Sequence, residues 1–118
     1  MNIATIACLL PALALTAAGC GASIPPPNDE WAAAQGDVGR AQAGGAPNVP
    51  EAKLHMQLAE ENLQTSKGLI NNDNRRATDL VAVARVEARL ALSLARQRLS
   101  EEEAKKAQAE LAKAKGGQ

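Results

Sequence analysis

The chain has 118 residues, of which 46% are hydrophobic, 22% are charged and 1% are aromatic, and its thirteen basic residues balance thirteen acidic ones. That length suffices for one small domain. Because 26 residues are alanine and Trp31 is the only aromatic residue, few large side chains are available for the core of a conventional enzyme. The zero formal net charge removes the usual electrostatic basis for binding nucleic acid. We therefore expect a protein that is not an enzyme and has no nucleic-acid partner.

Residues 1–19 are predicted to form a signal peptide. Residues 3–18 are almost entirely apolar, and the first charged side chain is that of Asp29. A transmembrane helix needs about 20 apolar residues, so a secretory signal is the better interpretation of this shorter segment. The segment then ends in LTAAGC, which closes at Cys20 and resembles the lipobox of bacterial lipoproteins, where small residues precede the cysteine.

The resemblance to a lipobox implies cleavage between Gly19 and Cys20 and a covalent lipid on Cys20, with no other cofactor. A diacylglycerol group and a further acyl chain anchor a protein strongly, because each buried methylene contributes roughly 0.8 kcal/mol. Gly21, rather than Asp, follows the cysteine. By analogy with bacterial lipoprotein sorting, this implies an outer-membrane protein that faces the periplasm. Two alternatives remain open: an ordinary cleaved signal that leaves Cys20 unmodified, and an uncleaved membrane anchor.

The mature chain is predicted to begin with a lipidated tether over residues 20–28, which is uncharged and rich in proline. Asn28 is a suitable N-cap for a helix over residues 29–43, in which apolar residues recur at helical spacing. Two internal glycines each cost this helix about 1 kcal/mol relative to alanine. The sequence does not decide whether the helix packs on the rest of the chain. Trp31 is expected to fill a gap between helices, with a membrane-interface anchor as the alternative.

Two longer helices are predicted over residues 50–70 and 75–115, followed by a frayed tail over residues 116–118. Pro50 suits the first turn of a helix, and the Asn/Asp-rich residues 71–74 tolerate the left-handed geometry of a chain reversal. Each helix carries an apolar seam in which steps of four and three residues alternate, as in a heptad repeat. The seam consists of Ala52, Met56, Ala59, Leu63, Ser66 and Ile70 in the first of these helices and Ala77, Val81, Ala84, Ala88, Ala91 and Ala95 in the second.

The predicted fold is all-α: a long antiparallel helical hairpin, coiled-coil-like with an alanine-rich seam, and a shorter N-terminal third helix. Small side chains on one helix let the larger ones of its neighbour approach closely. Beyond about residue 97 the long helix has no facing partner in the hairpin, so its end should project. The hairpin also predicts three facing pairs of opposite charge: Lys67 and Asp79, Glu61 and Arg85, and Glu51 and Arg96.

The segment over about residues 32–107 resembles a bacterial envelope family, the domain of unknown function 4398. The residues that carry the resemblance are GRAQAGGAPNVPEAKLHMQLAEENL and, after the Asn/Asp-rich turn, RRATDLVAVARVEARLALSLAR. The resemblance implies an alanine-rich helical lipoprotein of the cell envelope. It brings no catalytic residue with it.

Few residues suggest chemistry. His55 is the only histidine and is interpreted as a polar surface residue, and the spacing of a His/Cys metal site is absent from the sequence. An excess of arginine on the long helix, which includes Arg85, Arg89 and Arg96, has two interpretations. These side chains either pair with acidic residues of the preceding helix or contact an anionic polymer of the envelope.

The sequence therefore predicts an outer-membrane lipoprotein that acts as a periplasmic structural or adaptor protein through helix–helix association. Its partner would be a second copy of the chain or another helical envelope protein, engaged by an exposed alanine stripe and the projecting helix end. The alternative is a binding module that contacts peptidoglycan or another anionic envelope polymer through Arg85, Arg89 and Arg96.

Overall fold

The computed structural model describes residues 23–117, and all regular structure in this part of the chain is helical. Helix α1 spans Asn28–Ala43, the short 3-10 helix η1 spans Ala46–Asn48, α2 spans Pro50–Leu69 and α3 spans Asn74–Gly116. The bounds of the three α-helices differ from the predicted ranges by at most one residue. The expected signal peptide and Cys20 lie outside the described residues.

The turns between the helices use residues that tolerate left-handed geometry. Gly45, after α1, has a φ of +88°, and Asn71, after α2, has a φ of +71°. The Asp73 side chain caps α3 by accepting a 3.1 Å hydrogen bond from the backbone N–H of Arg76. The expected cap of α1 is wrong, because Asn28 already belongs to the helix and Pro27 precedes it without a side-chain cap.

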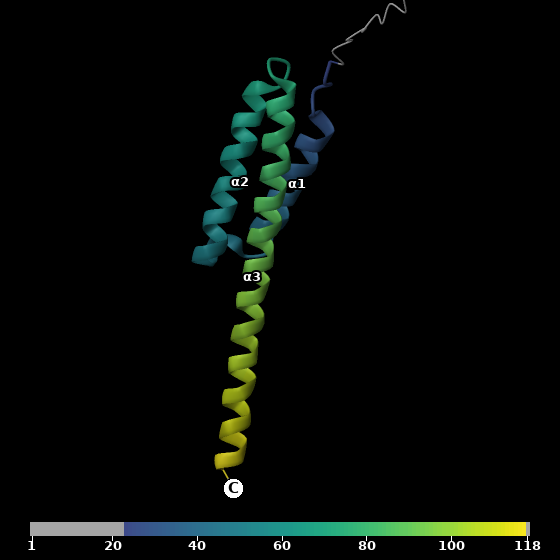
Figure 1. The fold of residues 1–118 in the computed structure, drawn as a ribbon. Helices are drawn as coiled ribbons and strands as arrows, with labels where there is room; N and C mark the ends of the chain where they lie inside the picture. Colours follow the sequence, from purple (N-terminus) through teal and green to yellow (C-terminus); the bar gives the residue numbers. More distant parts are fainter. Residues whose placement is uncertain (1–22, 118) are drawn as a thin grey trace, which may run out of the picture.

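Both α1 and α2 pack against the first half of α3 (Figure 1). All residues of the predicted seams except Ile70 are buried, with exposed fractions of at most 8%, whereas Ile70 is partly exposed. The six seam residues of α3 are at most 1% exposed, and five of them are alanines. Since these alanines carry nothing beyond Cβ, the neighbouring helices approach α3 closely. The alanine seam is thus an internal contact of this chain, and the expectation that it forms an exposed stripe is wrong.

Helix α1 is an integral part of the core, which answers a question that the sequence leaves open. One buried cluster includes Ala41, Met56 and Ala91, and a second includes Ala34 and Leu63 together with residues of α3. Each cluster therefore combines side chains from all three α-helices. Few of these side chains are large, so the core depends on close backbone approach over a long contact.

Trp31 fills space between helices, as the first of its two predicted roles requires. The indole is partly buried against the cluster that contains Leu63, and its Nε1–H donates a 3.1 Å hydrogen bond to the Leu63 carbonyl oxygen. The Lys67 ammonium lies 5.4 Å from the centroid of the ring. Trp31 thus joins α1 to α2.

The second half of α3 extends beyond the other helices, as the sequence predicts (Figure 1). Every residue from 99 to 117 is exposed. We call residues 99–116 the arm. With a rise of about 1.5 Å per residue, the 43 residues of α3 span about 64 Å, of which the arm contributes about 27 Å.

Part of the predicted tether, residues 23–27, contacts the folded helices. The Ile24 carbonyl oxygen accepts a 2.8 Å hydrogen bond from Nδ2 of Asn74, and Pro27 is buried. Because Asn74 is the first residue of α3, the chain enters the helical domain at the end that carries the α2–α3 turn. The arm leaves from the opposite end (Figure 1).

None of the three predicted charge pairs between α2 and α3 is among the ion pairs within residues 23–117. The polar contact between these helices joins Nδ1 of His55 and Oε2 of Glu87 at 2.6 Å. Their side chains are 28% and 23% exposed, so His55 is a partly buried interhelical residue rather than a simple surface residue. Arg85 instead reaches α1, because α1 places a buried carboxylate beside it.

Candidate functional site

The candidate site is centred on a buried acidic residue of α1. Asp37 lies between Ala34 and Ala41 at helical spacing, on the face of α1 that packs into the core, and its side chain is 2% exposed. Burying a carboxylate is costly unless cations and hydrogen-bond donors surround it. Asp37 therefore depends on the partners that α3 supplies.

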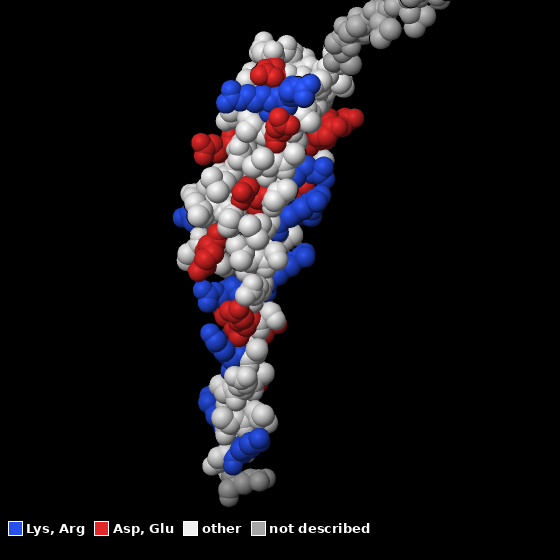
Figure 2. Space-filling model, viewed as in Figure 1, with Lys and Arg blue, Asp and Glu red and all other residues white. Residues whose placement is uncertain are grey.

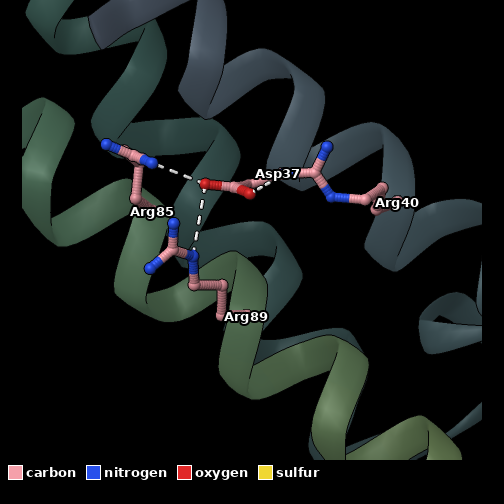
Figure 3. Close-up of polar contacts among 4 residues, drawn as sticks. All are labelled: Asp37, Arg40, Arg85 and Arg89. Carbon is pink, nitrogen blue, oxygen red and sulfur yellow. Dashed lines mark hydrogen bonds and ion pairs between the residues drawn. The ribbon is translucent and has the colours of Figure 1, made fainter.

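Three arginines surround Asp37 (Figure 3). Nε of Arg85 donates a 3.0 Å hydrogen bond to Oδ2 of Asp37, and Nε of Arg89 lies 3.5 Å from the same oxygen. Arg40, one turn further along α1, pairs with Oδ1. Because Arg85 and Arg89 are four residues apart, they project from the same face of α3. We call Asp37, Arg40, Arg85 and Arg89 the arginine cluster, which joins α1 to α3.

The arginines keep Asp37 ionised. Burial by itself raises the pKa of Asp37, but the hydrogen bonds from Arg85 and Arg40 and the positive charge of Arg89 outweigh this effect. The net result is a pKa below the ordinary value of 3.8. At neutral pH the arginine cluster thus contains one negative and three positive charges, because arginine stays protonated.

The arginines of the cluster are accessible although the carboxylate is not. The side chains of Arg40, Arg85 and Arg89 are 63%, 35% and 62% exposed. Figure 2 shows basic side chains gathered along the edge of the molecule where α1 lies. The cluster therefore presents positive charge to solvent around a carboxylate that solvent hardly reaches.

The structure brings together two of the three arginines that the sequence singled out. Arg85 and Arg89 share the Asp37 carboxylate, whereas Arg96 is exposed and makes no ion pair within the described part of the chain. The sequence analysis missed Asp37 and Arg40. A signal for Asp37 was present, since it stands three residues after Ala34 and four before Ala41 on the apolar face of the first helix.

In residues 23–117, no group of three or more His, Cys, Asp or Glu side chains is placed to hold a metal ion. None of the helices described is both long enough and apolar enough to span a bilayer. Every buried side-chain nitrogen or oxygen in this part of the chain has a hydrogen-bond partner.

The chain resembles a known protein family. A family model described as "Domain of unknown function (DUF4398)" matches residues 29–107. The match covers α1 from Asp29 onward, all of η1 and α2, and α3 as far as Ala107, which includes the arginine cluster and the first part of the arm. No curated protein and no solved structure matches the chain.

Proposed function

We propose that this chain, which belongs to the DUF4398 family, acts as a lipid-anchored structural or adaptor protein of the bacterial cell envelope. In this proposal the protein is not an enzyme, Cys20 carries the lipid, and the helical domain faces the periplasm from the outer membrane. The observation that carries the proposal is the arm, an exposed helix over residues 99–116. None of its residues belongs to the buried core of the described chain.

The positions of the two ends of the domain support this arrangement. Cys20 is separated from the start of α1 by only the short segment that ends at Pro27, and this segment is tied to the α2–α3 turn through Asn74. A lipid on Cys20 would therefore hold the turn end close to the bilayer. The arm would then point away from the membrane, because it leaves from the opposite end (Figure 1).

The packing of α2 and α3 supports an antiparallel hairpin as the rigid base of the arm. Met56, near the start of α2, shares a cluster with Ala91, whereas Leu63, nearer the end of α2, shares one with Val81. Since the residue numbers rise along α2 as they fall along α3, the helices run in opposite directions. The short turn between them and the cap at Asp73 support the same topology.

A helix is the partner that best fits the arm. Ala104, Ala107, Leu111 and Ala114 follow one another at alternating steps of three and four residues, the spacing of a coiled-coil seam. Leu111 is 56% exposed although it is apolar. Because the alanine seam of α3 is already buried within the chain, we place the partner on the seam of the arm. A second copy of this chain and a different helical envelope protein both satisfy this requirement.

Photocrosslinking in the envelope tests the proposal. A photoreactive amino acid is placed at Leu111 in the arm or, as a control, at Leu54 on α2, which is also 56% exposed. We expect crosslinks from position 111 to a second copy of this chain or to one defined helical protein, and none of them from position 54. Identification of the adducts by mass spectrometry separates the two partners. Equal adducts from both positions, or none from position 111, would contradict the adaptor function.

A further inference from the structure

The arginine cluster contains more positive charge than an ion-paired contact between two helices requires. One guanidinium group is enough to neutralise one carboxylate, but Asp37 is surrounded by Arg40, Arg85 and Arg89. Two positive charges therefore remain without compensation inside the cluster. Since like charges held close together repel each other, a further anion would stabilise this arrangement.

The geometry leaves donors free for such an anion. Arg85 and Arg89 both direct Nε toward the same oxygen of Asp37, at 3.0 and 3.5 Å. Among the described residues, the terminal nitrogens of these two side chains take part in no hydrogen bond. Asp37 thus fixes the two guanidinium groups next to each other from its buried position (Figure 3), while the Arg85 and Arg89 side chains are 35% and 62% exposed.

A phosphate group matches this arrangement in charge and in shape. A phosphate monoester carries about −1.5 to −2 charges at neutral pH and three acceptor oxygens, and guanidinium groups bind such oxygens in pairs. A carboxylate offers only one negative charge and two acceptor oxygens, and the cluster already contains one carboxylate, that of Asp37. We propose that Arg85 and Arg89 bind a phosphate group through their terminal N–H groups, with Asp37 as the positioning residue. This binding activity is separate from the adaptor function of the arm.

The first test is a titration of the full chain, solubilised in a non-ionic detergent, with inorganic phosphate. The arginine Nε–Hε signals are followed by NMR, and we expect those of Arg85 and Arg89 to shift in a saturable manner. Replacing both residues by glutamine should weaken binding at least about tenfold, because charge-assisted hydrogen bonds are lost. The control is R75Q/R76Q, which removes the same charge from exposed positions of α3 and should change affinity less than about twofold. An equal loss in both double variants would overturn the proposal.

The Asp37→Asn variant separates a built site from a diffuse patch of charge. The substitution makes the cluster more positive, so a diffuse patch would bind phosphate more tightly. A site that depends on the fixed arginines would bind it at least about threefold more weakly, since their orientation is lost. Tighter binding by a folded D37N protein overturns the proposal. If D37N does not fold, the NMR titration of the wild-type protein with phosphate still tests the proposal. The proposal is overturned if the Nε–Hε signals of Arg85 and Arg89 do not shift.

Vesicle flotation distinguishes the sources of the phosphate group. The full chain with Cys20→Ser, in which the proposed lipid anchor cannot form and cause flotation by itself, is mixed with phosphatidylcholine vesicles that contain or lack phosphatidic acid. The R85Q/R89Q variant of the same chain is compared in each case. Flotation that requires both phosphatidic acid and the two arginines assigns the site to a lipid headgroup. Saturable binding of inorganic phosphate without such flotation assigns it to a soluble phosphate compound. Absence of both overturns the proposal, while crosslinking from Leu111 tests the adaptor function independently.

Discussion

Replacing Asp37 by asparagine should destabilise the folded protein by about 2 kcal/mol. The substitution keeps the shape of the side chain but removes the charge that accepts hydrogen bonds from Arg85 and Arg40. A hydrogen bond to a charged group contributes about 1.5–3 kcal/mol. Because the arginine side chains are 35–63% exposed, water replaces part of what they lose, and the expected cost is below the sum of two such bonds.

Urea-induced unfolding, followed by far-ultraviolet circular dichroism, measures this cost. The control is Asp79→Asn, which removes an exposed carboxylate from α3 and should change the free energy of unfolding by less than about 0.5 kcal/mol. A double-mutant cycle with Arg85→Gln should give a coupling energy of at least about 1 kcal/mol. A D37N protein as stable as the control would refute the conclusion that Asp37 holds α1 on α3.

The contribution of Asp37 to the free energy of unfolding should depend on pH. The pKa of Asp37 is lowered in the folded protein, so its ionised form stabilises the fold at pH values above the ordinary value of 3.8. This stabilisation should decrease as the pH falls below that value and disappear once the folded carboxyl group is protonated. The difference in stability between wild type and D37N is therefore expected to be constant from pH 5 to 7 and to shrink below about pH 4. A difference that grows with acidification would contradict the assignment.

Two further pairs of substitutions test the helix packing by the same unfolding measurement. Gly39→Ala should raise stability by about 1 kcal/mol, since its Cβ would meet nothing within 4 Å, whereas Gly44→Ala should lower it by about 1–2 kcal/mol. The reason is that a Cβ at Gly44 collides with Cδ1 of Leu92 and lies 3.1 Å from a backbone oxygen of α1. Ala88→Leu, at a fully buried seam position, should cost at least about 2 kcal/mol, and Ala107→Leu on the arm less than about 0.5 kcal/mol. Equal effects within either pair would show that the packing differs from that described.

The helices were predictable because their signals are local. Pro50 stands at the first position of α2, and Asn71 and Asp73 have the backbone and side-chain properties that end one helix and begin the next. The alanines of α3 recur at heptad spacing, which predicts the buried face without knowledge of what covers it. The projection of the arm follows in turn from the shorter length of α2.

The arginine cluster was not predictable, because it depends on where α1 packs. The sequence argument compared only the second and third predicted helices, so it paired Arg85 with Glu61. In the structure α1 lies beside both helices and brings Asp37 to Arg85, a residue 48 positions away along the chain. No local pattern encodes that docking, since the turn that contains Gly45 permits several directions for α1. The partly buried contact of His55 with Glu87 was also missed, although both residues lie on the two helices that were compared.

The lipid anchor is the central claim of the proposed function, and intact-mass analysis tests it most directly. The protein is extracted from the membranes of its native host after separation of inner from outer membranes. The account predicts a chain that begins at Cys20, carries a diacylglycerol group and a further acyl chain, and is found in the outer-membrane fraction. A chain without lipid, cut at another position and recovered in the soluble fraction, would contradict it.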